Sequence, residues 1–169
     1  MKTVQNNRQK ITPFLWFDNN AEEAINFYTS IFKNSKITSI TRSGEDNNGT
    51  KGKMMVAAFE LNGQAFIALN GGPHFTFNEA ISFVISCETQ AEIDFMWEQL
   101  SAGGEEGRCG WLKDKFSLSW QIVPPVLSKL LQDKDAAKSK RVMEAMMQMT
   151  KIDINKLKQA YEQPDSITA

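Results

Sequence analysis

The hydrophobic and polar positions of this chain follow one order of elements twice. In the first half, period-2 and helical spacings predict a strand at 11–17, a helix at 21–32 and strands at 35–42, 54–61 and 64–70. In the second half, they predict a strand at 81–87, a helix at 90–101 and a last strand at 117–123. The pattern therefore predicts a duplicated strand-helix-strand unit.

The two units are 69 residues apart in the sequence. Residues 14–16 (Phe-Leu-Trp) correspond at this spacing to residues 83–85 (Phe-Val-Ile). Both helix entries have capping-box spacing, with an N-cap side chain and a glutamate three residues later, in the pairs Asn20 with Glu23 and Thr89 with Glu92. The spacing predicts the same cap on both helices.

Turn and breaker residues define the connections. Asn62-Gly63 is suited to a type I′ turn, so it predicts a hairpin between the strands at 54–61 and 64–70. Residues 43–53 carry three glycines and mixed charge, which indicates a mobile surface loop. After Pro124-Pro125 the pattern changes to helices at 126–131, 135–150 and 153–161. The predicted fold class is α+β, with antiparallel or mixed sheet and C-terminal helices.

Length and charge limit the class of protein. At 169 residues the chain suits one domain, built from modules at 11–72 and 80–124 with a helical extension at 125–162. Nineteen basic against 20 acidic residues give no field that would attract nucleic acid. No apolar run is long enough to cross a membrane, and only two cysteines favour a reducing compartment. We expect a cytoplasmic protein that binds neither nucleic acid nor membrane.

Three segments carry a resemblance to a known family: FLWFDNNAEEAINFY, FELNGQAFIALNGGPHFTFNEAISF and CGWLKDKFSLSWQIVP. With the module order, they resemble the glyoxalase/bleomycin resistance/extradiol dioxygenase superfamily, also called vicinal oxygen chelate. The nearer match is its PhnB-like branch, which is often labelled 3-demethylubiquinone-9 3-methyltransferase. The resemblance implies two βαβββ modules that form a cup, a divalent metal in many members, and a homodimer.

The ligands of that metal can be carried over position by position. The resemblance places them near Ile11 and Ala80 on the first strands, near Ala68 in the first hairpin, and at Gln121 on the last strand. Only Gln121 offers an oxygen, whereas zinc, iron or manganese needs three or four ligands. We therefore expect no metal site and no cofactor.

The methyltransferase label has little sequence support. Enzymes that use S-adenosylmethionine usually have a doubly wound parallel sheet with a glycine-rich turn after the first strand. Residues 69–72 (Leu-Asn-Gly-Gly) are the one hint, and we interpret them as a loop that links the modules.

Alternation along the last strand predicts which side chains face the cup. One face carries serines and Gln121, and the other carries apolar residues that pack on helices. The predicted ligand-binding residues are Leu15, Phe17, Ser82, Trp111, Ser119 and Gln121. The alternative is that these residues fill a core around buried water.

Two residues are candidates for the rim of the cup. His74 is either a surface residue or a general base, and Cys109 is either a buried inert thiol or a reactive one. Asp114 suits a turn better than acid catalysis. Residues 143–149 (MEAMMQM) hold half of the methionines, which suits a dimer contact, a lid or core packing.

Three hypotheses for function follow. The first is a protein that binds a small, partly apolar molecule in a metal-free cup. The second is an enzyme, either a diverged lyase or dioxygenase or the labelled methyltransferase. The third is a homodimer whose cup is vestigial. The sequence does not decide whether the chain is an enzyme, and it does not name the ligand.

Overall fold

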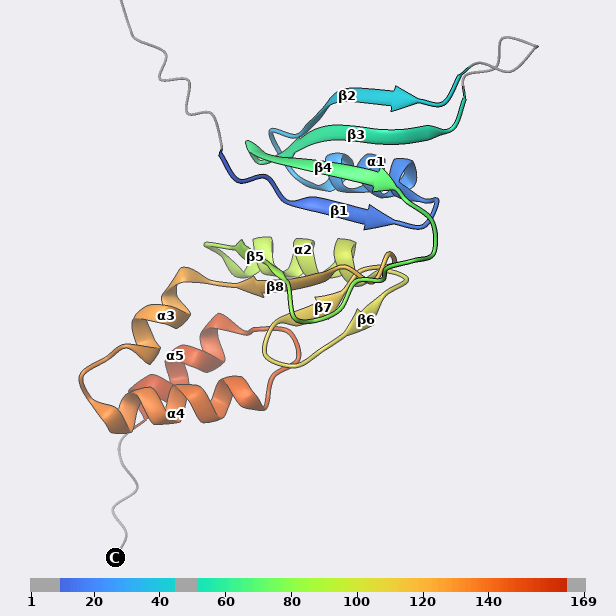
Figure 1. Ribbon diagram of the computed structural model, residues 1–169. Coiled ribbons are helices and arrows are strands. Elements are labelled where there is room, and N and C mark those ends of the chain that lie inside the picture. The colour runs from blue at the N-terminus through green and yellow to red at the C-terminus, as the bar shows by residue number, and fades with distance from the viewer. Residues whose placement is uncertain (1–9, 45–51, 164–169) are drawn as a thin grey trace, which may run out of the picture. The chain divides into compact units, whose positions relative to one another are not determined.

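The computed structural model describes residues 10–44 and 52–163 and divides into two compact units, Met1–Thr76 and Phe77–Ala169 (Figure 1). The boundary lies in the link predicted between the modules, and the C-terminal helices belong to the second unit. The predicted loop at 43–53 falls mostly outside the described residues; at its base the Ser43 N–H donates to Lys53 O at 2.9 Å.

The first unit is a βαβββ module. Its elements are β1 (Phe14–Phe17), α1 (Ala21–Ile31), β2 (Lys36–Arg42), β3 (Met54–Leu61) and β4 (Gln64–Asn70). They form one mixed sheet in the order β1-β4-β3-β2, in which β1 is parallel to β4 and the other pairs are antiparallel. The predicted strands and helix are all present, with bounds that shift by a few residues.

The β3–β4 hairpin is confirmed. Asn62 and Gly63 have φ angles of 47° and 82°, which is the left-handed conformation that both central residues of a type I′ turn require. The register then places Phe59 opposite Phe66, whose rings stack with centroids 5.4 Å apart.

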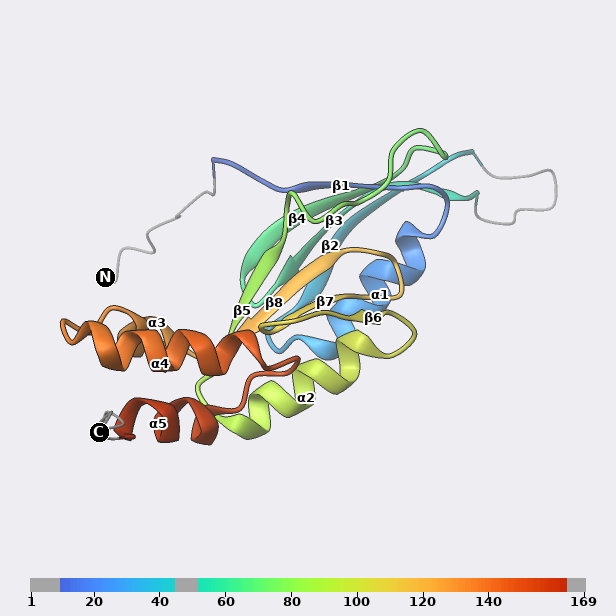
Figure 2. The same cartoon turned by 90° about the horizontal axis from the view of Figure 1, so that it is seen from below.

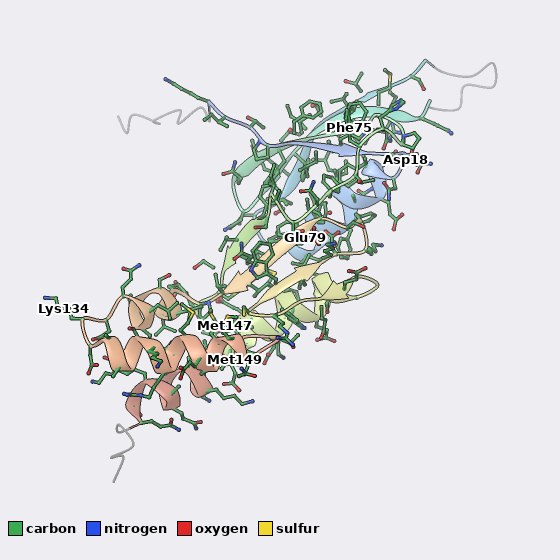
Figure 3. All side chains as sticks on the ribbon, turned by 60° about the horizontal axis from the view of Figure 1, so that its bottom comes forward. Asp18, Phe75, Glu79, Lys134, Met147 and Met149 are labelled. Atoms are coloured by element: carbon green, nitrogen blue, oxygen red, sulfur yellow. The ribbon has the colours of Figure 1, made fainter. Side chains whose placement is uncertain are left out.

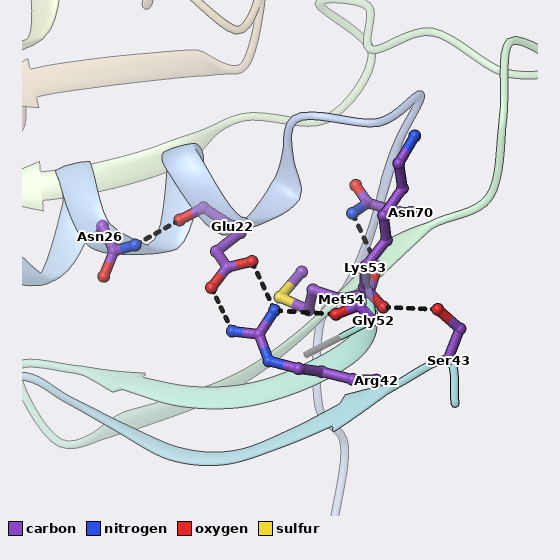
Figure 4. Close-up of polar contacts among 8 residues, drawn as sticks. All are labelled: Glu22, Asn26, Arg42, Ser43, Gly52, Lys53, Met54 and Asn70. Carbon is purple, nitrogen blue, oxygen red and sulfur yellow. Dashed lines mark hydrogen bonds and ion pairs between the residues drawn. The ribbon is translucent and has the colours of Figure 1, made fainter. Parts of the chain in front are cut away.

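The predicted capping box of α1 is wrong. Asn20 makes no side-chain hydrogen bond to the first turn. Asn70 at the end of β4 replaces it, because its Oδ1 accepts from the Ala21 N–H at 2.8 Å. Its Nδ2 donates to Met54 O, which holds the amide in place (Figure 4). The orphan donor is thus satisfied by a residue 49 positions away, which local spacing cannot reveal.

An ion pair fastens α1 to the end of β2. The guanidinium of Arg42 forms a bidentate pair with the Glu22 carboxylate and also donates to Gly52 O (Figure 4). This hydrogen bonding lowers the pKa of Glu22 below its ordinary value. Both side chains are partly exposed, so the pair fixes the position of the helix more than it stabilises the fold.

The second unit repeats the module and adds helices. Its elements are β5 (Phe83–Ser86), α2 (Gln90–Ser101), β6 (Glu105–Glu106), β7 (Trp111–Lys113), β8 (Ser119–Val123), α3 (Pro125–Leu131), α4 (Ala136–Met147) and α5 (Ile154–Glu162). The sheet order is β5-β8-β7-β6, with β5 parallel to β8. Two βαβββ modules with mixed sheets confirm the predicted α+β class.

The capping box of α2 is confirmed. The Thr89 side chain accepts from the Glu92 N–H at 3.2 Å, and the Glu92 carboxylate accepts from the Thr89 N–H.

The predicted correspondence between the first strands of the two modules, at a spacing of 69 residues, is wrong by one residue. Burial matches Phe17 with Cys87, because the link from strand to N-cap is one residue shorter in the second module. The repeat is therefore 69 residues at the helices and 70 at the first strands.

A buried carboxylate organises the turn between β7 and β8. Asp114 is 2% exposed; its Oδ1 accepts from the N–H groups of Phe116 and Leu118 at 2.8 and 3.1 Å, and its Oδ2 accepts from Trp120 Nε1 at 2.8 Å. This confirms Asp114 as a turn former. Ser117 belongs to the turn, with φ of 66°, so the last strand begins at Ser119 and not at 117.

The C-terminal helices α3, α4 and α5 lie together beyond the end of the second sheet (Figure 2). The segment between α4 and α5 attaches them. Cys109 and Gly110 donate backbone hydrogen bonds to Met149 O and Thr150 O, both at 2.8 Å. The Gln90 amide donates to Ile152 O and accepts from the Ile154 N–H. The extension is thus hydrogen-bonded to the module.

We expect Asp114→Ala to destabilise the protein by about 2–4 kcal/mol, because three buried donors lose a charged acceptor. Asp114→Asn should cost less, since its amide oxygen can still accept from the turn. Urea unfolding measures both. The exposed Glu98→Ala in the same module is the control and should change stability by less than about 0.5 kcal/mol. Equal stability of the alanine and control variants would contradict this role.

We expect Gln90→Ala to loosen the C-terminal extension without unfolding the module. Its loss leaves the Ile154 N–H and Ile152 O without the side-chain amide that satisfies them. Hydrogen exchange of residues 149–162 should accelerate by roughly tenfold or more, while exchange in β8 should not. Gln99→Ala, the same change on the same helix, is the matched control. Unchanged exchange in Gln90→Ala would refute this anchoring role.

Candidate functional site

The two faces of the first sheet differ in burial. Leu15 and Phe17 share one face with Ala57, Phe59 and Ala68, and all are 6% exposed or less. Helix α1 packs against β2, β3 and β4 and covers this face. Leu15 and Phe17 are therefore placed in the core of the first module. Their predicted role in ligand binding stays a prediction, and it has no support from this placement.

The opposite face of the first sheet is open and apolar. Phe14 is 55% exposed, and Trp16, two residues on, is half-buried on the same face. The Trp16 indole donates to Gly72 O at 2.9 Å and lies edge-on to the ring of Phe75. A Cβ at Gly71 would lie 2.3 Å from this indole, so only glycine fits there.

The second sheet is also covered on one face. Leu112, Trp120 and Ile122 are buried on the face against which α2 packs. The other face carries Val84, which is 61% exposed, and four more residues that the strand register places beside it: Trp111, Lys113, Ser119 and Gln121. This open face holds most of the predicted ligand-binding residues.

The segment that precedes β5, residues 77–82, is tied to this open face at two points. The Gln121 amide donates to Ser82 Oγ at 2.8 Å, and Lys113 Nζ lies 2.5 Å from the Glu79 carboxylate (Figure 3 labels Glu79). We call residues 77–82 the strap. Between its two anchors lies Ser119, which is fully buried; its Oγ has no hydrogen-bond partner among the described residues.

Sequence reasoning identified Ser82, Ser119, Gln121 and Trp111 but missed the strap ion pair. Lys113 could have been found, because it follows Trp111 by two residues and so shares its face. Glu79 could not, since no local pattern indicates that the strap approaches β7.

The two predicted rim residues have different environments. His74 is exposed in the first unit. Cys109 is half-buried, with φ of 58°, and its Sγ lies 3.7 Å from the Sδ of Met147. Met147 is the last residue of α4 (Figure 3 labels it). Of the two predictions for Cys109, the buried inert thiol agrees only in part with this half-buried position.

The methionines of residues 143–149 divide between two environments. Met149 is buried, whereas Met143 and Met147 are 43% and 48% exposed, one turn apart. This exposed pair is compatible with the predicted contact surface.

The donor set on the open faces does not fit a divalent metal. At the predicted ligand positions, Ile11 and Ala80 are exposed and Ala68 is buried, and none of their side chains has a lone pair to give to a metal. The one-residue shift puts Phe14 and Trp16 on the open face of β1, and these are equally inert. Within residues 10–44 and 52–163, no three His, Cys, Asp or Glu side chains gather as a metal site would require.

The glycine-rich segment at 69–72 also has a structural explanation. Asn70 caps α1, Gly71 admits the Trp16 indole, and Gly72 has φ of 84°. No helix follows it, as a nucleotide-binding turn would require. The interpretation of this segment as a link fits the structure.

Comparisons with known proteins agree with this architecture. A family model described as 3-demethylubiquinone-9 3-methyltransferase matches residues 9–123. The PhnB protein from Bacillus cereus is 41% identical over 69% of this chain and 99% of its own, with a TM-score of 0.62. Protein PA1353 from Pseudomonas aeruginosa is 20% identical over 69% and 97%, with a TM-score of 0.57.

A glyoxylase/bleomycin resistance protein/dioxygenase domain from Frankia is 16% identical over 69% of this chain and 91% of its own, with a TM-score of 0.44. No curated protein matches the chain. Among the described residues, no helix has the length and hydropathy needed to span a membrane.

Two βαβββ modules, each with a mixed four-stranded sheet, define a glyoxalase-like α+β protein. The chain belongs to the 3-demethylubiquinone-9 3-methyltransferase family, the PhnB-like family predicted from its sequence. The matched region ends where α3 begins, so the helical extension lies outside the family model.

The two cysteines should differ sharply in reactivity. Burial raises the pKa of the Cys87 thiol to about 11, with the Glu92 carboxylate adding to the effect. At pH 8 about one Cys87 in a thousand is therefore a thiolate, and the rate of alkylation should rise about tenfold per pH unit up to pH 10.

Peptide mapping after iodoacetamide treatment measures this difference. Cys109, which is half-buried, should be alkylated first at pH 8. The Cys87→Ala variant confirms the assignment of the slow site. Alkylation of both cysteines at the same rate at pH 8 would be inconsistent with a buried, protonated Cys87.

Proposed function

We propose that the open face of the second module binds a small, partly apolar molecule without a metal ion. The observation that supports this best is the mixture of side chains on that face. Val84 and Trp111 offer apolar and aromatic surface, while Ser82, Ser119 and Gln121 offer neutral hydrogen-bonding groups. A few polar groups among apolar ones are typical of sites that orient small ligands.

The polar groups of this face have hydrogen-bonding capacity that could serve a ligand. Gln121 donates to Ser82 through one amide hydrogen, which leaves its second hydrogen and its oxygen available for a ligand. Ser119 Oγ makes no hydrogen bond within the described part of the chain. A ligand that satisfies Ser119 would recover the free energy that this buried hydroxyl loses on folding, about 1–3 kcal/mol.

An enzyme is the second candidate, favoured by the description of the family as a methyltransferase. Against methyl transfer from S-adenosylmethionine, the described strands form two mixed sheets without the doubly wound parallel order that most such enzymes use. A diverged lyase or dioxygenase would require ligands that the open faces do not carry. We therefore rank binding above catalysis.

We further propose a homodimer, in which the exposed Met143 and Met147 of α4 are candidates for subunit contact. Two free cysteines in the described chain suit a cytoplasmic location.

Native mass spectrometry of freshly purified protein tests the site and the assembly together. We expect a dimer mass with a retained small molecule and no stoichiometric metal. Trp111→Leu and Gln121→Leu should each weaken retention by roughly tenfold, because a ring contact or a buried hydrogen bond is lost. Gln148→Leu on the exposed end of α4 is the matched control.

Two results would overturn the metal-free proposal. One is a stoichiometric divalent metal that disappears in Gln121→Leu. The other is specific binding of S-adenosylmethionine with methyl transfer, which would establish the enzyme instead.

A further inference from the structure

The strap is attached to the second sheet by a charged contact and a neutral one. Glu79 accepts from Lys113 on β7, and Ser82 accepts from Gln121 on β8. The hydrogen bond to Lys113 lowers the pKa of Glu79 and raises that of Lys113, so both groups are charged at neutral pH. A carboxylate of the chain itself is thus held on the open face.

Three side chains with hydrogen-bond donors occupy neighbouring positions on β7 and β8. Lys113 and Ser119 are direct partners across the β7–β8 ladder, so their Cβ atoms lie about 5 Å apart. Ser119 and Gln121 lie two residues apart on β8 and share its open face, at about 7 Å. An ammonium, a hydroxyl and an amide therefore line one short stretch of sheet, and the hydroxyl is buried without a hydrogen-bond partner among the described residues.

We propose that this stretch is a binding site for the carboxylate of a small molecule, and that Glu79 of the strap occupies it in the absence of ligand. The proposal rests on the proposed function, since it names the class of ligand that the same face would take. An incoming carboxylate replaces Glu79 at Lys113 and accepts from Ser119, whose hydroxyl Glu79 leaves unsatisfied. The apolar body of the ligand then lies on Val84 and Trp111.

The alternative is an ordinary surface ion pair. Glu79 is 61% exposed in its side chain, and such exposed pairs contribute little to stability. If the strap had only a structural role, the fold would be more stable with a hydrogen-bond partner for Ser119, or with alanine at position 119. A carboxylate has two oxygens that accept several hydrogen bonds, which matches one ammonium and one hydroxyl on neighbouring strands.

The test uses matched pairs of probes that differ only in charge: benzoate with benzamide, 1-naphthoate with 1-naphthamide, and decanoate with decanamide. Binding to the full chain is measured by calorimetry at low and high salt. We expect the wild type to prefer the carboxylate of at least one pair, and this preference to weaken with salt.

Two variants should act in opposite directions. Glu79→Gln removes the competing carboxylate and should tighten binding of that carboxylate by roughly threefold to tenfold. Lys113→Met should abolish the preference over the amide. Glu144→Gln and Lys140→Met, which change the ion pair on the exposed face of α4, are the matched controls and should leave both affinities unchanged.

Ser119→Ala separates binding from folding. Because the hydroxyl has no partner in the described structure, its removal should leave thermal stability unchanged or raised while weakening the carboxylate severalfold. Reduced stability with unchanged binding would show a structural role only.

The outcomes distinguish the two proposals. If acid and amide bind equally, and neither Glu79→Gln nor Lys113→Met changes this, the carboxylate site is wrong while small-molecule binding stands. If no member of the three pairs binds to the wild type or to Glu79→Gln, and native mass spectrometry shows no retained molecule, both proposals fail.

Discussion

Each module has one helix to cover a sheet that has two faces, and this constraint determines where function can lie. In the first module the covered face holds Leu15, Phe17 and Ala68, and in the second it holds Trp120 and Ile122. A four-stranded sheet needs one buried face to be stable. Its second face can stay open to solvent or to a binding partner. Each of the two modules therefore has one buried core and one open sheet face.

Sequence patterns predicted an element correctly where its stabilising contacts join residues close in sequence. The Asn62-Gly63 hairpin and the Thr89 cap depend on residues close in sequence, and both are present. The Asn20 cap failed because Asn70, brought near by the parallel pairing of β1 with β4, already satisfies the first turn. A competing partner from a distant strand leaves no mark in the local spacing.

The site was predicted in part for the same reason. Alternation along β8 placed Ser119 and Gln121 on the open face, since strand parity is a local property. The faces of Leu15 and Phe17 depended instead on matching two first strands, and a link one residue shorter before α2 reverses that parity. The Glu79 contact to Lys113 arises from the path of a connecting segment, which neither strand encodes.

The difference between the two open faces carries more information about function than the repeat does. The first face presents Phe14 and Trp16, and the carboxylate of Glu60 on β3 pairs with Lys36 on the edge strand β2. The second presents a lysine, a buried hydroxyl and an amide. Since the modules share element order and sheet pairing, the fold does not require this polarity, and a buried hydroxyl costs free energy when no hydrogen bond satisfies it. The hydroxyl of Ser119, buried without a hydrogen-bond partner among the described residues, is therefore the feature that most distinguishes the second face from the first.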